Sequence, residues 1–143
     1  DELLADIRSV VQQLRLHDGI ALREVLQALA APFPRPRVHL ELVDDARVAS
    51  LDQAEAVLRT VQEALTNTAR HSNAENLWIV LRQDGGALAL DIRDDGRGQG
   101  ELVFGNGLSG MRERWQSLGG ALHARRGEHG GVQLSATLPE RVG

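Results

Sequence analysis

The chain has 143 residues, a net charge of −4, 3% aromatic residues and no cysteine. This length suits one domain with a single core of mainly aliphatic side chains, and the lack of cysteine excludes disulfides and thiolate metal sites and is typical of a reducing compartment. The negative charge and the scattered basic residues argue against a nucleic-acid partner, and no apolar run approaches the roughly 18 to 20 residues of a membrane span or resembles a signal peptide.

The first segment, residues 1–18, is predicted to be the end of a helix. Its apolar residues follow the spacing of a helical-bundle seam: Leu3, Ile7, Val10 and Leu14. So short a segment is a poor free-standing helix, so it either continues a bundle or packs on the core of this domain. The chain starts at Asp1 and its one methionine is Met111, so we expect a fragment of a longer protein.

Residues 19–37 are predicted to form a second helix and a stiff connector. The helical pattern runs from Ile20 to Ala30 and ends before a proline-rich stretch that contains Pro32, Pro34 and Pro36. A strand from Val38 to Leu42 then begins the main domain, which we expect to span residues 38–143.

The longest helical pattern runs from Leu51 to Ala74. Its apolar side consists of Ala54, Val57, Leu58, Val61, Leu65 and Ala69. Another stripe carries Glu63, Asn67, Arg70 and His71, which lie one or two turns apart. Such a stripe suits a metal-bound triphosphate: Glu63 can orient or deprotonate an attacking group, Asn67 can ligate Mg²⁺, and Arg70 can pair with phosphate. An ordinary solvated helix face has the same pattern.

Two strands follow, from Asn76 to Gln83 and from Ala87 to Asp94, and the Asp84-Gly85-Gly86 run between them indicates a hairpin. Alternate side chains of a strand share one face, so Asp94 lies on the same side as the apolar Leu90 and Ile92. A carboxylate on a buried face is costly unless a donor reaches it. An adenine 6-amino group is a donor of the right kind.

The run Asp94-Asp95-Gly96-Arg97-Gly98 ends the second of these strands. Its glycines lack a Cβ, so the backbone can pass close to a flat ligand. The alternative is a tight turn with a solvated pair of aspartates.

A second glycine-rich run, Gly105-Asn106-Gly107-Leu108-Ser109-Gly110, is predicted to be a loop that leads into a helix from Met111 to Leu118. Unpaired amides and the positive end of the helix dipole favour bound phosphate at such a junction. The alternative is a flexible loop with a glycine cap. Gly119-Gly120 is predicted to end the helix.

The last predicted strands run from Ala121 to Arg126 and from Val132 to Leu138. Together the predicted elements indicate an α+β sandwich with helices on one face of a β-sheet, preceded by a short helical segment.

Three segments resemble the nucleotide-binding boxes of the Bergerat-fold ATPases, a group that includes histidine kinases, gyrase and MutL. Glu63 to His71 is similar to the N box, Asp94 to Gly98 to the first glycine box, and Gly105 to Met111 to the second. The match is closest to the ATP-binding domain of two-component sensor histidine kinases of the nitrate-sensor and DesK type, and it covers Val38 to Pro139. It implies a Bergerat-type two-layer sandwich with a mixed β-sheet.

The resemblance also implies roles for the matching residues. Asp94 would accept the adenine amino group, Asn67 would hold Mg²⁺, and Glu63 would be the catalytic residue that assists phosphoryl transfer. Residues 99–104 correspond to a short nucleotide lid. The implied nucleotide-binding residues are Asn67, Arg70, His71, Asp94, Gly96, Gly98, Gly105, Gly107, Leu108 and Gly110.

One position departs from the pattern of this family. Many relatives have Gly-Thr near the last strand, where the hydroxyl reaches a water beside the adenine, and this chain has Gly131-Val132. Either that water is held otherwise or the affinity for the nucleotide is lower.

The pair His17-Asp18 resembles the phosphoacceptor pair of histidine kinases. Only residues 19–31 separate it from the proline-rich connector, and they are too few for the second dimerisation helix that the resemblance requires. We therefore expect the phosphoacceptor histidine to lie outside this chain, with residues 1–18 as the end of a dimerisation helix.

The predicted function is that of the ATP-binding catalytic domain of a sensor histidine kinase, which transfers the γ-phosphoryl group of Mg-ATP to a histidine. The resemblance implies that this domain is cytoplasmic and that its parent protein is a homodimer. Parent proteins of this family can be anchored by membrane helices. Its expected partners are ATP, Mg²⁺, the dimerisation and phosphoacceptor domain of the parent, and a response regulator. The alternatives are an anti-sigma-factor serine kinase that acts mainly by protein binding, and a degenerate domain that binds nucleotide for regulation.

Overall fold

A computed structural model describes residues 20–21, 23–34, 36–43, 47–48, 51–71, 74–84, 87–96, 106–126 and 131–139. The predicted helix within residues 1–18 and the lid of residues 99–104 lie outside these ranges. The helices are α2 (Arg23–Ala30), α3 (Leu51–His71) and α4 (Asn106–Ser117). The strands are β1 (Ile20–Ala21), β2 (Arg37–Val43), β3 (Arg47–Val48), β4 (Asn76–Asp84), β5 (Ala87–Asp94), β6 (Ala121–Arg126) and β7 (Val132–Leu138).

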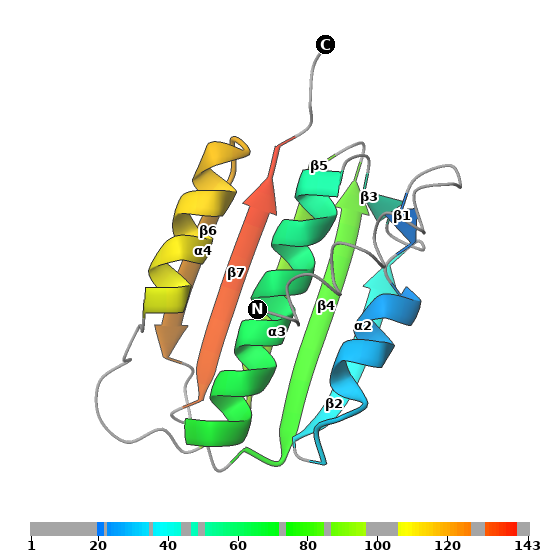
Figure 1. The fold of residues 1–143 in the computed structure, drawn as a ribbon, viewed down its shortest axis with the longest axis vertical. Helices are drawn as coiled ribbons and strands as arrows, with labels where there is room; N and C mark the ends of the chain where they lie inside the picture. The colour runs from blue at the N-terminus through cyan, green and yellow to red at the C-terminus, as the bar shows by residue number, and fades with distance from the viewer. Residues whose placement is uncertain are drawn as a thin grey trace.

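The main sheet has five strands in the order β2-β4-β5-β7-β6. Strands β2 and β4 are parallel, and every other neighbouring pair is antiparallel, so the sheet is mixed. Figure 1 shows α2, α3 and α4 side by side on one face of this sheet. The predicted α+β sandwich with helices on one face is therefore confirmed.

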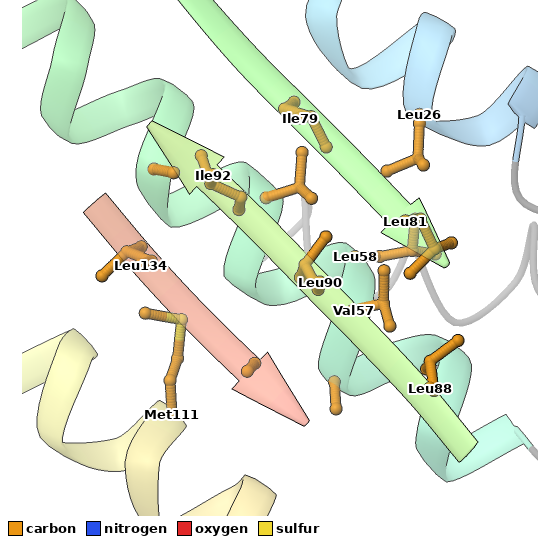
Figure 2. Close-up of a cluster of buried hydrophobic side chains, with 14 of the residues drawn as sticks. Leu26, Val57, Leu58, Ile79, Leu81, Leu88, Leu90, Ile92, Met111 and Leu134 are labelled. Atoms are coloured by element: carbon orange, nitrogen blue, oxygen red, sulfur yellow. The ribbon is translucent and has the colours of Figure 1, made fainter. Parts of the chain in front are cut away.

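The core lies between the three helices and the sheet. Alternation along β4 and β5 turns Ile79, Leu81, Leu90 and Ile92 toward the helices, where Leu26 of α2 and Met111 of α4 join them (Figure 2). The predicted apolar side of α3 is buried as well, at Ala54, Val57, Leu58, Val61 and Leu65. Each large aliphatic side chain buried in this way stabilises the fold by about 1.5–3 kcal/mol.

The main strands lie where the sequence predicts them, and β5, β6 and β7 have the predicted bounds. The beginning of the second predicted helix is different, because Ile20–Ala21 forms β1 and pairs antiparallel with β3, whose two residues the sequence analysis missed. A two-residue strand has no room for an alternating pattern. Its pairing with a segment far along the chain therefore gives no local signal.

The glycine-rich loop predicted before the last helix is the largest correction. Helix α4 begins at Asn106, so Gly107, Leu108 and Gly110 are helical residues. Glycine costs about 1 kcal/mol relative to alanine inside a helix, which is why the sequence favours a loop. Burial of Met111 and Trp115 further along the same helix overrides this local preference.

The predicted glycine stop of α4 is confirmed. Gly119 has φ +88°, its N–H donates to the Gln116 carbonyl at 3.0 Å, and the Gly120 N–H donates to the Trp115 carbonyl at 2.8 Å. These two bonds form a Schellman motif, which satisfies the last carbonyls of the helix.

None of the helices in the described ranges is both long and apolar enough to cross a membrane.

Candidate functional site

Several chain segments meet at one end of the two layers. In Figure 1 the C-terminal end of α3 and the start of β7 lie at the bottom of the view, and the start of α4 is the lower end of that helix, so it faces the same end. Strand β5 is antiparallel to β7, so it ends where β7 begins. The predicted nucleotide boxes are thereby brought to the same end of the molecule from positions far apart in the sequence.

Asp94 is the last residue of β5 and pairs with Leu77 of β4. It follows the buried Leu90 and Ile92 on the face that the helices cover, as predicted, and its side chain is half-buried. Two backbone donors hold its carboxylate. The Gly96 N–H donates to Oδ1 at 2.8 Å, and the Val132 N–H donates to Oδ2 at 3.4 Å.

This environment changes the chemistry of the Asp94 carboxyl. Burial raises the pKa of Asp94 above its ordinary value, the hydrogen bonds from Gly96 and Val132 act to lower it, and the nearby negative charge of Asp95 adds to the rise. An ionised carboxylate can accept about four hydrogen bonds, and the part of the chain that the structure describes supplies two of them. The remaining capacity suits an amino group of a ligand.

Gly131 is a site residue that the sequence analysis did not select. A Cβ at this position would lie 2.2 Å from the Asp94 carbonyl oxygen and 2.9 Å from Asp94 Oδ1. Only glycine lets the backbone pass this close, and this approach brings the Val132 N–H to the carboxylate. The resemblance singled out the Gly131-Val132 pair for its missing hydroxyl, but no signal in the sequence shows that Gly131 lies against Asp94.

Val132 is the position at which the resemblance leads us to expect threonine, and its backbone N–H and its side chain make separate contacts. The backbone N–H binds Asp94, while the partly buried side chain packs against the hydrophobic core. The interaction of this position with the Asp94 carboxylate therefore needs no hydroxyl group.

Two candidate residues lie one turn apart on α3. Glu63 is half-buried and Asn67 is exposed, so both can be reached from solvent. Among the described residues, no group of three or more His, Cys, Asp or Glu side chains could hold a metal ion. Mg²⁺ often uses few protein ligands together with substrate phosphates and water, so the single amide oxygen of Asn67 fits such an ion.

The other candidates are described in part. Arg70 and His71 are in the last turn of α3, and Gly107 and Leu108 are in the first turn of α4, but the structure does not describe their side chains. Gly98 and Gly105 lie outside the described residues. The remaining two candidates are described: Gly96 is buried beside Asp94, and Gly110 is exposed on α4 with nothing within 4 Å of an added Cβ.

A groove of about 540 Å³ lies elsewhere in the fold, along α2 and β2. It is lined largely by apolar side chains such as Leu26, Phe33 and Leu40, and it contains none of the candidate residues. Its lining offers neither of the carboxylates on which the candidate site depends.

Comparison with known proteins identifies relatives of this chain. Residues 52–142 match the family model described as histidine kinase-, DNA gyrase B-, and HSP90-like ATPase. The sensor histidine kinase YxjM of Bacillus subtilis is 33% identical over 96% of this chain and 35% of its own length. The nitrate/nitrite sensor protein NarX of Escherichia coli is 32% identical over 96% of this chain and 24% of its own length.

A solved structure gives the same fold. The blue-light activated histidine kinase EL346 of Erythrobacter litoralis superimposes with a TM-score of 0.70, at 24% identity, over 95% of this chain and 46% of that protein. The present chain spans about a quarter to a third of the curated relatives named above. The resemblance based on the three boxes is thereby confirmed, and these matches give no support to the serine-kinase alternative.

Proposed function

The chain belongs to the family of histidine kinase-, DNA gyrase B-, and HSP90-like ATPases, and on this premise we propose that it binds Mg-ATP and transfers the γ-phosphoryl group to a histidine. The observation that carries the proposal is the half-buried Asp94 carboxylate, which two backbone N–H groups hold at the end where the predicted boxes meet. The acceptor histidine belongs to another part of the parent protein.

Adenine recognition is assigned to Asp94. Its carboxylate accepts the 6-amino group of the base, and the buried Gly96 lets the chain turn directly beside it. Since charge-assisted hydrogen bonds are about twice as strong as neutral ones, this contact discriminates adenine from bases that lack a donor at the same position.

The phosphate side of the site is assigned to the end of α3 and the start of α4. Asn67 would ligate Mg²⁺ through its amide oxygen, and Arg70 and His71 are assigned to the phosphates together with the backbone of residues 105–110, of which Gly107, Leu108 and Gly110 are helical. Unpaired N–H groups at a helix N-terminus favour phosphate. Bound Mg²⁺ supplies charge neutralisation.

The catalytic role is assigned to Glu63. It orients the attacking imidazole or accepts its proton while the bond between the γ-phosphorus and the ADP oxygen breaks. The Glu63→Gln variant should therefore bind ATP with normal affinity and transfer phosphate more slowly when the acceptor domain is supplied.

The parent protein is proposed to be a homodimeric sensor kinase that passes the phosphoryl group on to a response regulator. In it, residues 1–18 end a dimerisation helix, residues 19–37 form the connecting segment, and residues 38–143 form a cytoplasmic ATP-binding domain. The connecting segment packs as part of this domain, because Val25 and Leu26 of α2 are buried in the core that they share with the sheet.

The test is a calorimetric titration of the domain with ATP, with and without Mg²⁺, beside Asp94→Asn. Saturable binding that is lost in Asp94→Asn supports the proposal. The control is Asp91→Asn, which removes a carboxylate from the same strand but from the opposite face, where Asp91 Oδ1 accepts the Ser135 hydroxyl at 2.9 Å. Equal ATP affinity in the wild type and Asp94→Asn would overturn the site assignment.

A further inference from the structure

Asp95, the second aspartate of the run, points away from the nucleotide site and binds the beginning of β4. Its Oδ1 accepts the N–H groups of Glu75 and Asn76, each at 2.9 Å, and its Oδ2 accepts the Asn76 side-chain amide, also at 2.9 Å. The Asp95 N–H in turn donates to the Asn76 carbonyl at 3.3 Å. Four hydrogen bonds thus join Asp95 to Glu75, which precedes β4, and to Asn76, the first residue of β4.

These bonds lie directly beside the residue that we assign to adenine recognition. The regular pairing of β4 with β5 ends at Leu77 and Asp94, so the chain leaves the sheet at Asp95. The next N–H, that of Gly96, turns back to Asp94 Oδ1. Fixing Asp95 to β4 therefore fixes the turn whose N–H group orients the Asp94 carboxylate.

The orientation of the Asn76 amide is set from β2, the strand that flanks β4 on the edge away from β5. His39 Nε2 donates to Asn76 Oδ1 at 2.8 Å, which leaves the amide NH₂ to face Asp95. The His39 ring stacks on Trp78, with a centroid distance of 5.4 Å and an interplanar angle of 16°, and the Arg93 guanidinium lies 4.6 Å from the Trp78 ring. These stacking contacts hold the imidazole donor in place on the face that no helix covers.

The charge state of Asp95 agrees with this arrangement. Burial acts to raise the pKa of Asp95, but the hydrogen bonds from the Asn76 side chain and from the Asn76 and Glu75 N–H groups outweigh it, so the pKa lies below its ordinary value. Asp95 is thus an acceptor for all three donors at neutral pH.

We propose that Asp95, oriented through Asn76, is a positioning residue for adenine recognition: it holds the β5 terminus against β4 so that the Asp94 carboxylate meets the 6-amino group. This inference rests on the proposed function, because it concerns how the same site selects its base. Asp95 itself touches no part of the nucleotide.

The test compares the affinities for ATP and inosine triphosphate, in which a carbonyl oxygen replaces the 6-amino group. The phosphates of the two ligands are identical, so their affinity ratio reports how well Asp94 is aligned. In Asp95→Ala we expect this ratio to fall about tenfold, the effect of losing one well-placed hydrogen bond. The affinity for inosine triphosphate should stay within about twofold, because the phosphate contacts remain.

A reciprocal pair of substitutions separates positioning from loss of folding. In Asp95→Asn, Oδ1 can still accept both backbone N–H groups, but the new NH₂ faces the NH₂ of Asn76, so the ratio should fall. Adding Asn76→Asp restores a donor–acceptor pair at this contact and should restore the ratio. The matched control is Asp52→Asn, an exposed aspartate in the first turn of α3, which should leave the ratio unchanged.

The outcomes distinguish this inference from the proposed function. A wild type that binds neither nucleotide removes the proposed function and this inference with it. A wild type that prefers ATP while Asp95→Asn and Asp95→Ala keep the same ratio overturns only the positioning role. The same conclusion holds if both affinities fall equally with a lowered midpoint of unfolding, because Asp95 would then support the fold alone.

Discussion

Gly131 lies directly against Asp94, so close that a methyl group on Gly131 would meet the Asp94 carbonyl oxygen at 2.2 Å. This contact joins the start of β7 to the end of β5. It is also the reason that the Val132 N–H reaches Asp94 Oδ2. The shape of the candidate adenine site therefore depends on a missing side chain as much as on the carboxylate itself.

Gly131→Ala is expected to destabilise the domain and weaken ATP binding. The new methyl group must displace backbone atoms, and overpacking of this kind costs about 1–3 kcal/mol. Urea unfolding and calorimetry measure the two effects. For stability alone, the comparison is Gly110→Ala on α4, whose new methyl group meets no atom within 4 Å and which should raise the free energy of unfolding by about 0.5–1 kcal/mol. ATP affinity is not compared at this position, because Gly110 is assigned to the phosphate side of the site. An unchanged stability in Gly131→Ala would contradict the close approach.

The pH dependence of ATP affinity should show the raised pKa of Asp94. An adenine amino group needs the ionised carboxylate as acceptor, so affinity should begin to fall at a pH above the ordinary range for aspartate, which is about 4. Calorimetric titrations from neutral pH downward, with Mg²⁺ in excess, measure this fall.

The stability contribution of Asp94 has the opposite sign. Its pKa in the folded, unbound state lies above the unfolded value, so the folded state favours the proton. Asp94 therefore opposes folding at neutral pH, and this effect disappears as the pH falls through the folded pKa toward the unfolded value.

The ATP titrations have their own contradicting outcome. An ATP affinity that stays flat down to the ordinary pKa of aspartate would argue against Asp94 as the adenine acceptor.

Asn67→Ala should reduce the effect of Mg²⁺ on ATP affinity by about tenfold, because the protein oxygen that we assign to the ion is lost. Binding without Mg²⁺ and the stability of the domain should change little, since Asn67 is exposed. Titrations at several Mg²⁺ concentrations measure the effect. Gln116→Ala removes an exposed amide from α4 and serves as the control. A full Mg²⁺ effect in Asn67→Ala would remove this residue from the metal role.

Thr60→Val should lower the free energy of unfolding by about 1–3 kcal/mol. Trp115 Nε1–H donates to Thr60 Oγ1 at 2.9 Å, and this hydroxyl donates to the Ala56 carbonyl at 2.7 Å. Both side chains are buried, so valine leaves the indole N–H without its partner and loosens α4 from α3. Denaturant unfolding measures the loss.

Two further variants of the same kind show whether the hydroxyl is responsible. Thr60→Ser keeps the hydroxyl and should retain most of the stability. Thr137→Val makes the same change at an exposed position of β7 and should have little effect. Equal effects of valine at positions 60 and 137 would show that the buried hydrogen bond contributes nothing.

Elements with a strong local pattern could be predicted from the sequence. Alternation gave the bounds of β5, β6 and β7, and the long apolar stripe gave α3 to within three residues of its end. Asp94 could likewise be placed on the covered face by counting along its strand. These predictions succeed because the period of a strand or a helix depends on neighbouring residues alone.

The sequence by itself therefore determined the family, the two-layer α+β architecture and the position of the adenine-binding candidate. The tertiary structure decided the pairing of β1 with β3, the start of α4 at Asn106, and the two sets of contacts on either side of Asp94. Val132 meets Asp94 across 38 residues, and Asn76 meets Asp95 across 19. No local pattern encodes such contacts, because they form only when separate strands are brought together by the burial of a shared core.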